Sequence, residues 1–514
     1  MPEPVSFQEH VFKNVALIGL SLFFLPLDTF VVAACLALNA ARSLVFPLRP
    51  PLRYDGRRKT VLVSSLAMGK GLCLARVFHL AGHRVVGVDF DTAHFAHARV
   101  PSAGRFSRAV DRHYAVTTPV DAGSRARYAD EMLALVEAEG ADLWVCVSGV
   151  ASTVEDALLK ARIEKQTKCR VFQPAPETCE ALHDKGEFIR AAERAGLKTP
   201  VTVLVESRAA VLRVLDAHPA LSFIAKCVEL DDVSRADMTR LPQPTRAATE
   251  AFVGGLDISP AKRWVVQQFV HGSEYCTHAV VVRGRVKAFV ACASSEMLMH
   301  YEALPAEAPV SRAMLAFTRR LLRTLEGGSL TGQLSFDFLV DLHEAFAKDA
   351  RDIDALPIEC NPRTHTAVVL LAAQPQALAD AYLALLDQPE PRHKKKGGPP
   401  PADDTEIASV LRPNTDGASK TRVHWLGHDV VTEAAMPLWD TLWRRSSVRA
   451  CVKSLFWFVV RAVGWKDATL EMWDPVPWWF LYHVYYPYMF ATSLVTGKRW
   501  SRVNVSTTRV FESY

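Results

Sequence analysis

The order of apolar and polar positions predicts alternating strands and helices after an apolar N-terminal stretch. Val61 to Leu66 reads as a strand buried on both faces, and GKGLCLARVFHLAG repeats apolar residues at helical spacing. RVVGVDFD, from Arg84 to Asp91, has a second strand pattern, and YADEMLALVEAEG precedes a third in Ala141 to Gly149. Strands that alternate with helices predict an open parallel sheet, so we assign residues 59–172 to a Rossmann-like domain.

The pattern changes at residue 173 to short strands separated by turns. VTVLV, LSFIAKCV and WVVQQFV are strand-like, and HAVVVRGRVKAFVACASS predicts a hairpin that turns at Arg283 and Gly284. LTGQLSFDFLV and ALPIECNP predict a second hairpin, whose strands are joined by an exposed, charged loop from Asp341 to Asp354. We therefore expect two α+β lobes, over residues 173–270 and 271–387.

The N-terminal segment, residues 1–58, has the length and apolar character of a membrane segment. Asn14 to Phe46 is long enough to span a bilayer, but Pro26 and Asp28 interrupt it near the middle. No basic region leads it, as one would in a secretory signal peptide. Three alternatives are open: an interfacial or hairpin membrane anchor, a single span, and a helix docked on the protein's own core.

The C-terminal part divides into a polar segment and an aromatic one. Residues 388–420 include HKKKGGPPPADD, which cannot bury a core and predicts a flexible linker. Residues 421–514 hold nine of the eleven tryptophans. Aromatic side chains at this density suit a membrane interface or packing against the N-terminal segment, and both alternatives stay open.

Composition narrows the class of protein. The 514 residues are too many for one compact domain, and 49% hydrophobic with 22% charged residues is typical of globular chains. The 60 basic and 55 acidic residues are interspersed, so we expect no nucleic-acid partner. The ten cysteines form no CxxC pair or zinc-type cluster. We therefore expect reduced thiols in a cytoplasmic protein, with or without membrane association through its apolar ends.

Polar residues of the second hairpin have the chemistry of a magnesium site. LSFDFL and IECNPRTH supply Asp337, Glu359 and Asn361, and the alternation of side chains along strands places them on one face. Carboxylate and amide oxygens suit Mg²⁺ and leave positions for phosphate oxygens and water. Arg363 follows closely and would neutralise a phosphoryl group in transit. The surrounding strand residues are apolar, and carboxylates buried among them need a cation.

The order of the motifs resembles the ATP-grasp superfamily from about Val61 to Leu386. Similarity to the mycosporine-glycine synthases within that superfamily is carried by ISPAKRWVVQQFVHGSEYCTH, LTGQLSFDFL and IECNPRTH. The resemblance implies an α/β and α+β chain: an ATP-grasp fold with a Rossmann-like pre-ATP-grasp domain, an apolar N-terminal helical segment and an aromatic-rich C-terminal extension. The superfamily match depends on Asp184-Lys185, the strand lysine Lys226, QQFVHGSE ending at Glu274, Asp337, and Glu359 with Asn361.

The resemblance also implies roles in nucleotide binding. Lys185 and Lys226 correspond to phosphate-binding lysines, and Glu274 to the carboxylate that accepts the ribose hydroxyls. Gln267 departs from the glutamate common at its position, which a backbone contact tolerates. The segment whose backbone would read adenine comprises Gln267, Gln268, Phe269 and Val270.

Catalytic candidates follow the second hairpin. Arg363 would stabilise the transferred phosphoryl group, and His365 is the preferred substrate-side residue or base. A structural role and a functional role are equally open for four other residues near the inferred site: His278, Ser294, Ser295 and Glu296.

The implied activity is a carbon–nitrogen ligation that uses ATP and Mg²⁺, or Mn²⁺ in its place. An amino acid, glycine first, would be joined to a 4-deoxygadusol-like cyclohexenone through a phosphorylated ring, giving mycosporine-glycine, ADP and phosphate. One alternative is an ATP-grasp amide or peptide ligase that acts through an acyl phosphate. A second is a catalytically inactive, membrane-associated scaffold that binds ATP.

Overall fold

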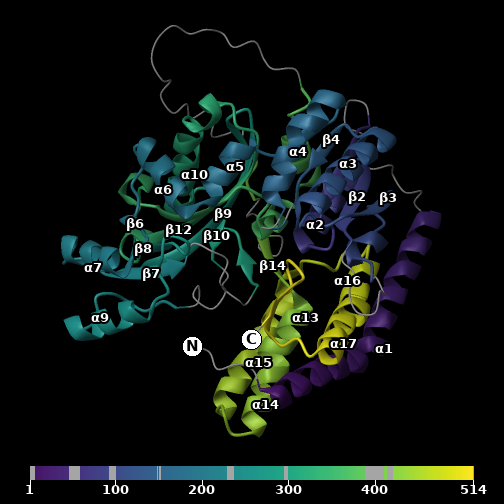
Figure 1. Cartoon of the computed structure of the whole chain (residues 1–514). Helices are drawn as coiled ribbons and strands as arrows, with labels where there is room; N and C mark the ends of the chain where they lie inside the picture. Colours follow the sequence, from purple (N-terminus) through teal and green to yellow (C-terminus); the bar gives the residue numbers. More distant parts are fainter. Residues whose placement is uncertain are drawn as a thin grey trace.

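The mixed α/β and α+β architecture is confirmed by a computed structural model of the chain, in which four units adjoin (Figure 1). They are a Rossmann-like domain, two lobes built on antiparallel sheets, and a C-terminal region that packs with the N-terminal helix. The structure describes residues 6–45, 58–91, 100–147, 149, 152–227, 237–294, 299–387, 410–413 and 421–512.

The Rossmann-like domain has a parallel five-stranded sheet in the order β3-β2-β1-β4-β5. Val61, Leu62 and Val63 are fully buried and alternate between two hydrophobic cores, as expected for a strand covered on both faces. Its strands are β1 (Thr60–Ser64), β2 (Arg84–Phe90), β3 (Arg112–Val116), β4 (Leu143–Val145) and β5 (Arg170–Phe172), and its helical elements are α2 (Gly69–Leu80), η2 (Ala103–Phe106), α3 (Ala122–Glu139) and α4 (Thr153–Gln166).

The first lobe is a three-stranded antiparallel sheet in the order β6-β8-β7, with α7 and α9 beside it (Figure 1). Its apolar core includes Val211, Phe223 and Val266, all buried, from a helix and two of its strands. The elements are β6 (Thr202–Val205), α7 (Arg208–Ala217), β7 (Phe223–Cys227), α9 (Arg246–Gly255) and β8 (Trp264–Gln268).

The second lobe is a four-stranded antiparallel sheet in the order β10-β9-β12-β13, with α10 on one face. The expected turn between β9 and β10 falls at Arg283 and Gly284, whose φ angles of 49° and 74° are those of a tight hairpin. The elements are β9 (Gly272–Val282), β10 (Arg285–Ala293), α10 (Pro309–Leu322), η3 (Leu325–Gly328), β12 (Gly332–Asp341), η4 (Glu344–Phe346), η5 (Ala350–Asp352), β13 (Leu356–Asn361), η6 (Thr366–Leu371) and α11 (Pro375–Leu383).

Two helices that precede the first lobe in sequence belong to the core of the second. They are α5 (Pro176–His183) and α6 (Lys185–Arg194). Phe188 of α6 stacks on Phe336 of β12, with ring centroids 5.8 Å apart, and shares a core with Phe317 of α10. The first lobe is therefore inserted between α6 and β9 of the second.

Aromatic packing joins the Rossmann-like domain to the second lobe. Tyr382 of α11 is fully buried, and its ring centroid lies 5.7 Å from that of Phe78 and 4.8 Å from that of Phe172. Its hydroxyl donates to Gln333 Oε1 at 2.7 Å, so the buried polar atom is satisfied. This packing fixes α2 against the sheet of the second lobe, which carries Asp337 and Glu359.

The C-terminal region begins with a strand that extends from the second lobe. β14 (Arg422–His424) pairs with β11 (Tyr301–Glu302) and with β15 (Lys466–Asp467). Around them fold α13 (Leu426–Asp429), η8 (Val430–Ala435), α14 (Met436–Leu442), α15 (Val448–Gly464), α16 (Val476–Phe480), η9 (Leu481–Tyr485), α17 (Tyr486–Thr496), β16 (Trp500–Asn504) and β17 (Arg509–Glu512).

Part of the predicted linker is packed structure. Val410 is buried, and Leu411 forms a parallel bridge with Ala288 of β10. Residues 410–413 therefore belong to the second lobe, because they extend its sheet. The rest of the 388–420 prediction lies outside the described residues.

The N-terminal segment is one helix, α1 (Phe7–Val45), which contains Pro26. A hairpin anchor is therefore ruled out for these residues. Asp28 does not interrupt the apolar surface because its carboxylate lies 2.9 Å from His483 Nε2 in the C-terminal region. α1 packs on α17 and α16, so the aromatic tail does meet the N-terminal segment (Figure 1).

A buried ion pair fastens the C-terminal region to the Rossmann-like domain. Arg76 of α2 donates from Nε to Asp474 Oδ2 and from Nη1 to the Thr469 carbonyl, both at 2.8 Å. Ser107 Oγ and the Arg108 amide also donate to the Asp474 carboxylate. The Arg76 and Asp474 side chains are 6% and 0% exposed, so each charge depends on the other.

Arg76→Met should lower the free energy of unfolding of this junction by about 3–5 kcal/mol, because the substitution leaves the buried Asp474 carboxylate without its cation. Hydrogen exchange of α2 and of residues 469–474 would measure the loss. Arg422→Met is the matched control: its ion pair with Glu302 is half exposed, so removal should cost less than about 1 kcal/mol. Equal protection in both variants would contradict this role for Arg76.

Candidate active site

The three candidate metal ligands lie on one face of the β12–β13 hairpin. Asp337 is opposite Glu359, and Asn361 is opposite Ser335, two residues from Asp337. Asn361 Nδ2 lies 3.4 Å from Asp337 Oδ2. The neighbouring residues Phe336 and Phe338 point into the core on the other face, which fixes this orientation. Two carboxylates and an amide therefore share this face, a donor set that suits a magnesium ion, and the Asn361 amide oxygen accepts from Arg363 in this conformation.

The electrostatics of this group favour a bound cation. Burial raises the pKa of Asp337 well above its ordinary value, and the carboxylates of Glu359 and Glu274 raise it further. Arg363 and Lys185 act in the opposite direction but are outweighed. A divalent cation would hold both facing carboxylates in the ionised form, because it replaces like-charge repulsion by attraction.

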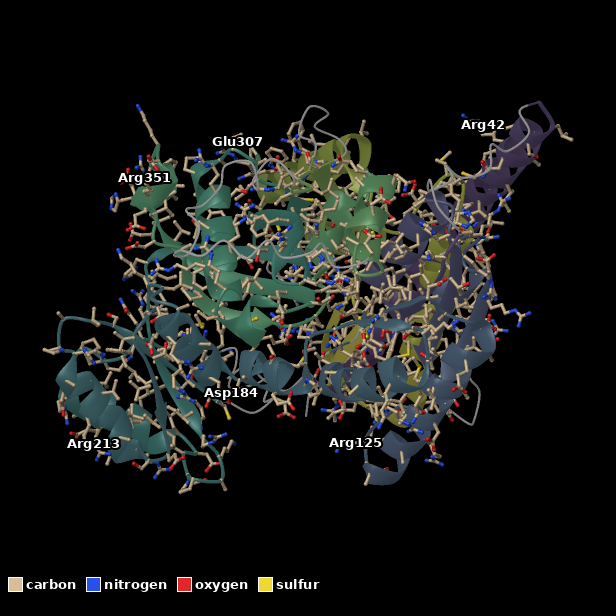
Figure 2. All side chains as sticks on the ribbon, turned by 90° about the horizontal axis from the view of Figure 1, so that it is seen from above. Arg42, Arg125, Asp184, Arg213, Glu307 and Arg351 are labelled. Atoms are coloured by element: carbon tan, nitrogen blue, oxygen red, sulfur yellow. The ribbon has the colours of Figure 1, made fainter. Side chains whose placement is uncertain are left out.

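Two cationic side chains flank the acidic group. Lys185 Nζ lies 3.2 Å from Glu359 Oε2, and Arg363 Nη2 donates to Asn361 Oδ1 at 2.6 Å. Lys185 is the first residue of α6, and Asp184 caps that helix by accepting from the Glu187 amide at 2.9 Å. Figure 2 shows Asp184 between Arg213 of the first lobe and Arg125 of the Rossmann-like domain. The Asp184 cap thus fixes the start of α6, where Lys185 lies.

Glu274 belongs to the same sheet face. It is two residues from Cys276, which is the strand partner of Asp337, so Glu274, Cys276 and Asp337 share a side. The Glu274 carboxylate is exposed and accepts from Ser294 Oγ at 2.8 Å. Gly272 begins the strand because a Cβ there would lie 2.2 Å from the Val340 carbonyl oxygen. Ser295 and Glu296 lie outside the described residues.

The predicted adenine-reading segment connects the two lobes. Gln267 and Gln268 end β8, and Phe269 and Val270 lead into β9. The amide of Gln268 donates to the Val201 carbonyl and that of Phe269 to the Ser222 carbonyl, both at 2.7 Å. Gln267 is buried, with its side-chain amide 3.3 Å from Thr202 Oγ1. The Gln267 side chain and the amides of Gln268 and Phe269 thus have structural partners, and the other main-chain groups of this segment remain as candidate nucleotide contacts.

Lys226 lies in the first lobe, apart from the acidic group in sequence and sheet. It is on β7, opposite Val265 of β8, and its side chain is half buried. The interactions of Lys185, Glu274, Asp337, Glu359, Asn361 and Arg363 link them into one group, whereas Lys226 is placed beside the connecting segment.

Lys70 was not singled out by the sequence analysis, yet it joins this site from the Rossmann-like domain. Its side chain is 2% exposed, and Nζ donates to the Thr364 carbonyl at 2.6 Å. Burial lowers the pKa of Lys70 well below its ordinary value, and Arg363 lowers it further. The signal in the sequence was a lysine between two glycines at the start of an otherwise apolar helix.

Two histidines stand beside Lys70. His278 is fully buried on the same face of β9 as Glu274, and its Nδ1 lies 3.4 Å from the amide nitrogen of His365. Burial and the neighbouring His365 and Lys70 lower the pKa of His278 to about 3. Burial, together with Arg363 and Lys70, lowers the pKa of His365 to about 3 as well. Both imidazoles are therefore neutral at physiological pH, and each can accept a proton only at a cost.

His365 also has a local structural role. Its Nδ1 accepts from the Ala367 amide at 3.2 Å and caps η6. The remaining ring nitrogen, Nε2, is the one that a substrate could approach. His278 Nε2 is buried and has no hydrogen-bond partner among the described residues. These two nitrogens mark a polar spot beside Arg363.

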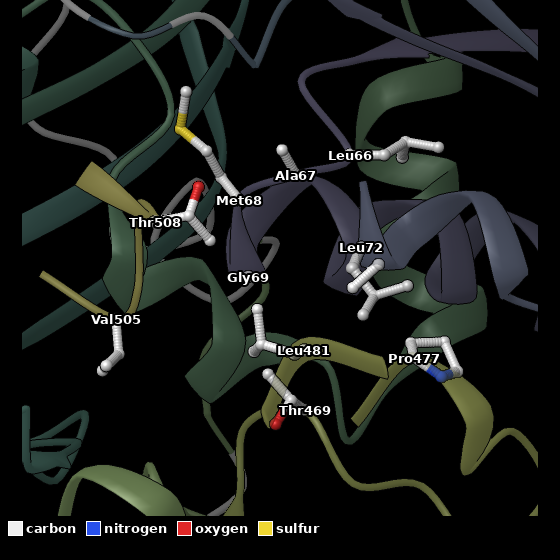
Figure 3. A pocket seen from close by; sticks show the side chains of 11 residues that line it. Leu66, Ala67, Met68, Gly69, Leu72, Thr469, Pro477, Leu481, Val505 and Thr508 are labelled. Atoms are coloured by element: carbon white, nitrogen blue, oxygen red, sulfur yellow. The ribbon is translucent and has the colours of Figure 1, made fainter. Parts of the chain in front are cut away.

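The turn after β1 does not present a free phosphate loop. The Gly69 amide at the start of α2 donates to the Ser506 carbonyl of the C-terminal hairpin at 2.9 Å. Figure 3 shows the small hollow here, which is lined mainly by apolar side chains from both units, including Leu66, Leu72, Pro477 and Leu481. The Gly69 amide is therefore not offered to a phosphate in this conformation. Gly71 serves close packing, since a Cβ there would lie 2.2 Å from the Ser65 carbonyl oxygen.

A second histidine and carboxylate cluster lies in the C-terminal region. Asp429 is fully buried and its two oxygens lie 2.9 Å from His300 Nε2 and 2.7 Å from His424 Nδ1. Arg461 pairs with Glu433 in the same cluster. The carboxylates already have cationic or hydrogen-bonding partners, so we interpret this cluster as a structural network.

No protein-family model matches the chain, and no curated protein matches it. Among solved structures, an L-amino acid ligase from Bacillus licheniformis is 14% identical, with a TM-score of 0.44 over 64% of this chain and 75% of that chain. An N5-carboxyaminoimidazole synthetase from Staphylococcus aureus complexed with ADP is 12% identical, with a TM-score of 0.44 over 67% and 80%. A biotin carboxylase complex from Campylobacter jejuni is 14% identical, with a TM-score of 0.43 over 63% and 71%. At these values the likeness carries no functional argument, which depends on the side chains described above.

His278→Gln should reduce the loss of stability on acidification. The unfolded chain binds a proton on this histidine below pH 6.5, whereas the folded chain does so only near pH 3, so the wild type loses stability as pH falls from 6.5. The lowered pKa corresponds to about 2 kcal/mol between pH 7 and pH 5. Urea unfolding at both pH values would measure the free energy of unfolding of variant and wild type. An equal loss of this free energy in the two proteins between pH 7 and pH 5 would contradict a buried neutral imidazole.

Proposed function

We propose that the protein is an ATP-dependent carbon–nitrogen ligase of the ATP-grasp type. The observation that carries this proposal is the register of β12 and β13, which sets Asp337 against Glu359 with Asn361 beside them. Cations on both sides of this group, Lys185 and Arg363, suit the phosphate oxygens of a nucleotide. The reaction would take place in the cytoplasm, where ATP is available.

The donor set fits a magnesium–nucleotide complex. Asp337, Glu359 and Asn361 would hold Mg²⁺, or Mn²⁺ in its place, and the ion would neutralise charge on the phosphates. Lys185 would release Glu359 and contact a phosphate oxygen, since an ammonium group can exchange one anionic partner for another. Lys226 would approach the phosphates from the first lobe, where β7 lies beside the connecting segment.

The adenosine end would lie at the junction of the lobes. Backbone groups of residues 267–270 would contact adenine, and Glu274 at the start of β9 would accept the ribose hydroxyls. Glu274 is exposed and accepts from Ser294, so a ribose hydroxyl can reach it. Because Glu274 shares a face with Asp337, the ribose and the phosphates would lie on the same side of the sheet.

The acceptor would bind beside Lys70, His278 and His365. Arg363 connects this spot to the metal ligands through Asn361, so an acceptor oxygen here would lie on the phosphate side of the site. Among the described residues this spot offers hydrogen-bonding nitrogens beside the Arg363 guanidinium and no carboxylate, which favours an anionic or enolic acceptor. His365 would act as a substrate-side residue through Nε2, because its lowered pKa makes it a weak base.

The proposed chemistry has two balanced steps. An acceptor oxygen attacks the γ-phosphorus, a P–O bond of ATP breaks, and ADP leaves. The amine then forms the C–N bond, phosphate leaves with the activated oxygen, and one proton is released. Arg363 would stabilise charge on the transferred phosphoryl group. No protein nucleophile takes part.

We propose an amino acid, glycine first, and a 4-deoxygadusol-like cyclohexenone as the substrates, with mycosporine-glycine as the product. The similarity of LTGQLSFDFL and IECNPRTH to the mycosporine-glycine synthases supports this choice. A carboxylic acid acceptor, activated as an acyl phosphate and converted to an amide, would use the same nucleotide residues. An anionic carboxylate also suits the basic spot, so the acceptor class must be measured.

The deciding experiment is an ADP-release assay with purified protein, ATP and Mg²⁺. We expect turnover with the cyclohexenone plus glycine, together with a new ultraviolet-absorbing conjugate. Turnover with amino acids or other carboxylates alone would replace the mycosporine proposal by the amide ligase. No ADP release with either acceptor, despite nucleotide binding, would favour the inactive scaffold.

Glu359→Gln should lower the rate of ADP release by about 100-fold, because one anionic metal ligand and the partner of Lys185 are lost. Added Mg²⁺ should restore part of the rate, since the defect is in metal binding. Glu307→Gln is the matched control: this exposed carboxylate lies in the same lobe (Figure 2) and should leave the rate unchanged. Full activity of Glu359→Gln would refute the metal site.

Lys70→Met should raise the acceptor KM about 10-fold, as expected for loss of one hydrogen bond from a buried amine. The affinity for Mg²⁺–ADP, measured by calorimetry, should stay unchanged because Lys70 belongs to the acceptor side. Lys198→Met, which removes an exposed lysine from a surface pair, is the control. An equal loss of ADP affinity and acceptor affinity in Lys70→Met would place Lys70 on the nucleotide instead.

A further inference from the structure

Helix α1 has its polar side toward the protein and its apolar side outward. His10 and Asn14 are buried, although both are polar. Ser21 Oγ donates to the Tyr482 carbonyl at 2.9 Å, and Asn39 Nδ2 donates to the Met472 carbonyl at 2.8 Å. Trp500 Nε1 donates to Asn14 at 3.0 Å, and Trp479 Nε1 donates to Thr29 at 2.9 Å. This orientation is the reverse of that of a helix on a protein surrounded by water.

The outward side of α1 carries almost no charge. Asp28 is the only acidic or basic residue between Lys13 and Arg42, and it is 17% exposed and paired with His483. This stretch would be about 40 Å long at the rise of an α-helix. Its most apolar window has a mean hydropathy of 2.2, and none of that window is buried. Large apolar side chains exposed on this helix are Phe7, Phe12, Val15, Leu22, Phe23, Leu27, Phe30, Leu36, Leu38 and Leu44.

The apolar surface continues onto two helices of the C-terminal region. The Phe12 ring lies 4.7 Å from that of Trp439 on α14, and α14 packs on α15 (Figure 1). A surface so apolar and so extended indicates contact with another apolar phase. The exposed side chains here are Met436, Leu438, Trp439, Leu442, Trp443, Val448, Val452, Phe456, Trp457, Val459, Val460 and Val463.

Basic residues lie on the connection between α14 and α15 and on the first two turns of α15, and we call this segment the basic connection. Four are exposed, and Asp440 is the only acidic residue from Met436 to Gly464. Exposed tryptophans accompany them at 439, 443 and 457. This combination suits the headgroup region of an anionic bilayer, where indole rings and arginines both find partners. The four exposed basic residues are Arg444, Arg445, Arg449 and Lys453.

We propose that α1, α14 and α15 form a docking face for the surface of an anionic lipid bilayer. α1 would lie in the plane of the interface. Hydrogen bonds at Asn14, near its start, and at Asn39, near its end, hold the helix along the C-terminal region. A spanning helix would have to break these bonds. A second copy of the chain fits less well, since an isologous contact would oppose the basic connection to itself.

Vesicle sedimentation of the full chain tests this face. We expect the protein to pellet with vesicles of phosphatidylcholine and phosphatidylglycerol, less with phosphatidylcholine alone, and to elute as a monomer without lipid. The double variant Phe23→Glu with Phe30→Glu should bind at least about 10-fold more weakly, since two carboxylates would enter the apolar phase. Both side chains are more than two-thirds exposed, at 76% and 71%, so the fold should tolerate the change.

The matched control is Phe346→Glu, which replaces a phenylalanine that is 86% exposed on η4 of the second lobe. Figure 2 places the neighbouring Arg351 on the opposite side of the molecule from Arg42 of α1. Equal binding by wild type and the double variant, with equal melting temperatures, would overturn the proposal. Self-association that Phe23→Glu with Phe30→Glu abolishes would identify a second copy as the occupant, and resistance to alkaline carbonate extraction would identify a span.

A substitution of the basic connection separates lipid charge from simple apolar adhesion. Arg444→Gln, Arg445→Gln and Arg449→Gln together should remove the preference for anionic vesicles and the salt dependence of binding, while weak binding to neutral vesicles remains. An unchanged preference for anionic vesicles would refute the assigned headgroup contact. ADP release should be the same in all these variants without lipid, so failure of the ligase proposal leaves this test intact.

Discussion

The candidate site depends on one constraint: two carboxylates face each other across neighbouring strands. Asp337 and Glu359 are held opposite one another by main-chain pairing and by the phenylalanines on the other face, so they cannot separate without disturbing the sheet. Their proximity is costly for the isolated protein because it favours a proton on Asp337. Lys185 and Arg363 offset part of that cost. A bound metal ion would remove the remaining cost, so the repulsion between the two carboxylates would favour a metal–nucleotide complex.

The surroundings of this pair come from distant parts of the chain. α6 precedes the first lobe yet packs behind β12, and Lys70 enters from the Rossmann-like domain. Arg76 and Asp474 hold the C-terminal region against the same helix α2. The proposed acceptor spot therefore combines Lys70 of one unit with His278 and His365 of the lobe that carries the two strands, so it depends on how these two units pack.

The sequence predicted the strands and the alternation of Asp337, Glu359 and Asn361 because these follow from local periodicity. It also located the turn at Arg283 and Gly284. It did not predict Lys70, whose place in the site depends on a contact 294 residues away. Nor could the pattern of α1 reveal that its polar side faces inward, because the partners of those residues are at the other end of the chain.

The reversed polarity of α1 has a consequence for biosynthesis. Groups that satisfy its polar side, such as Trp500 and the Met472 carbonyl, are translated 486 and 433 residues after their partners on the helix. During elongation the nascent segment therefore has no native surface on which to rest, and its apolar side is prone to aggregate. Shielding of this apolar side until those partners are translated would prevent such aggregation.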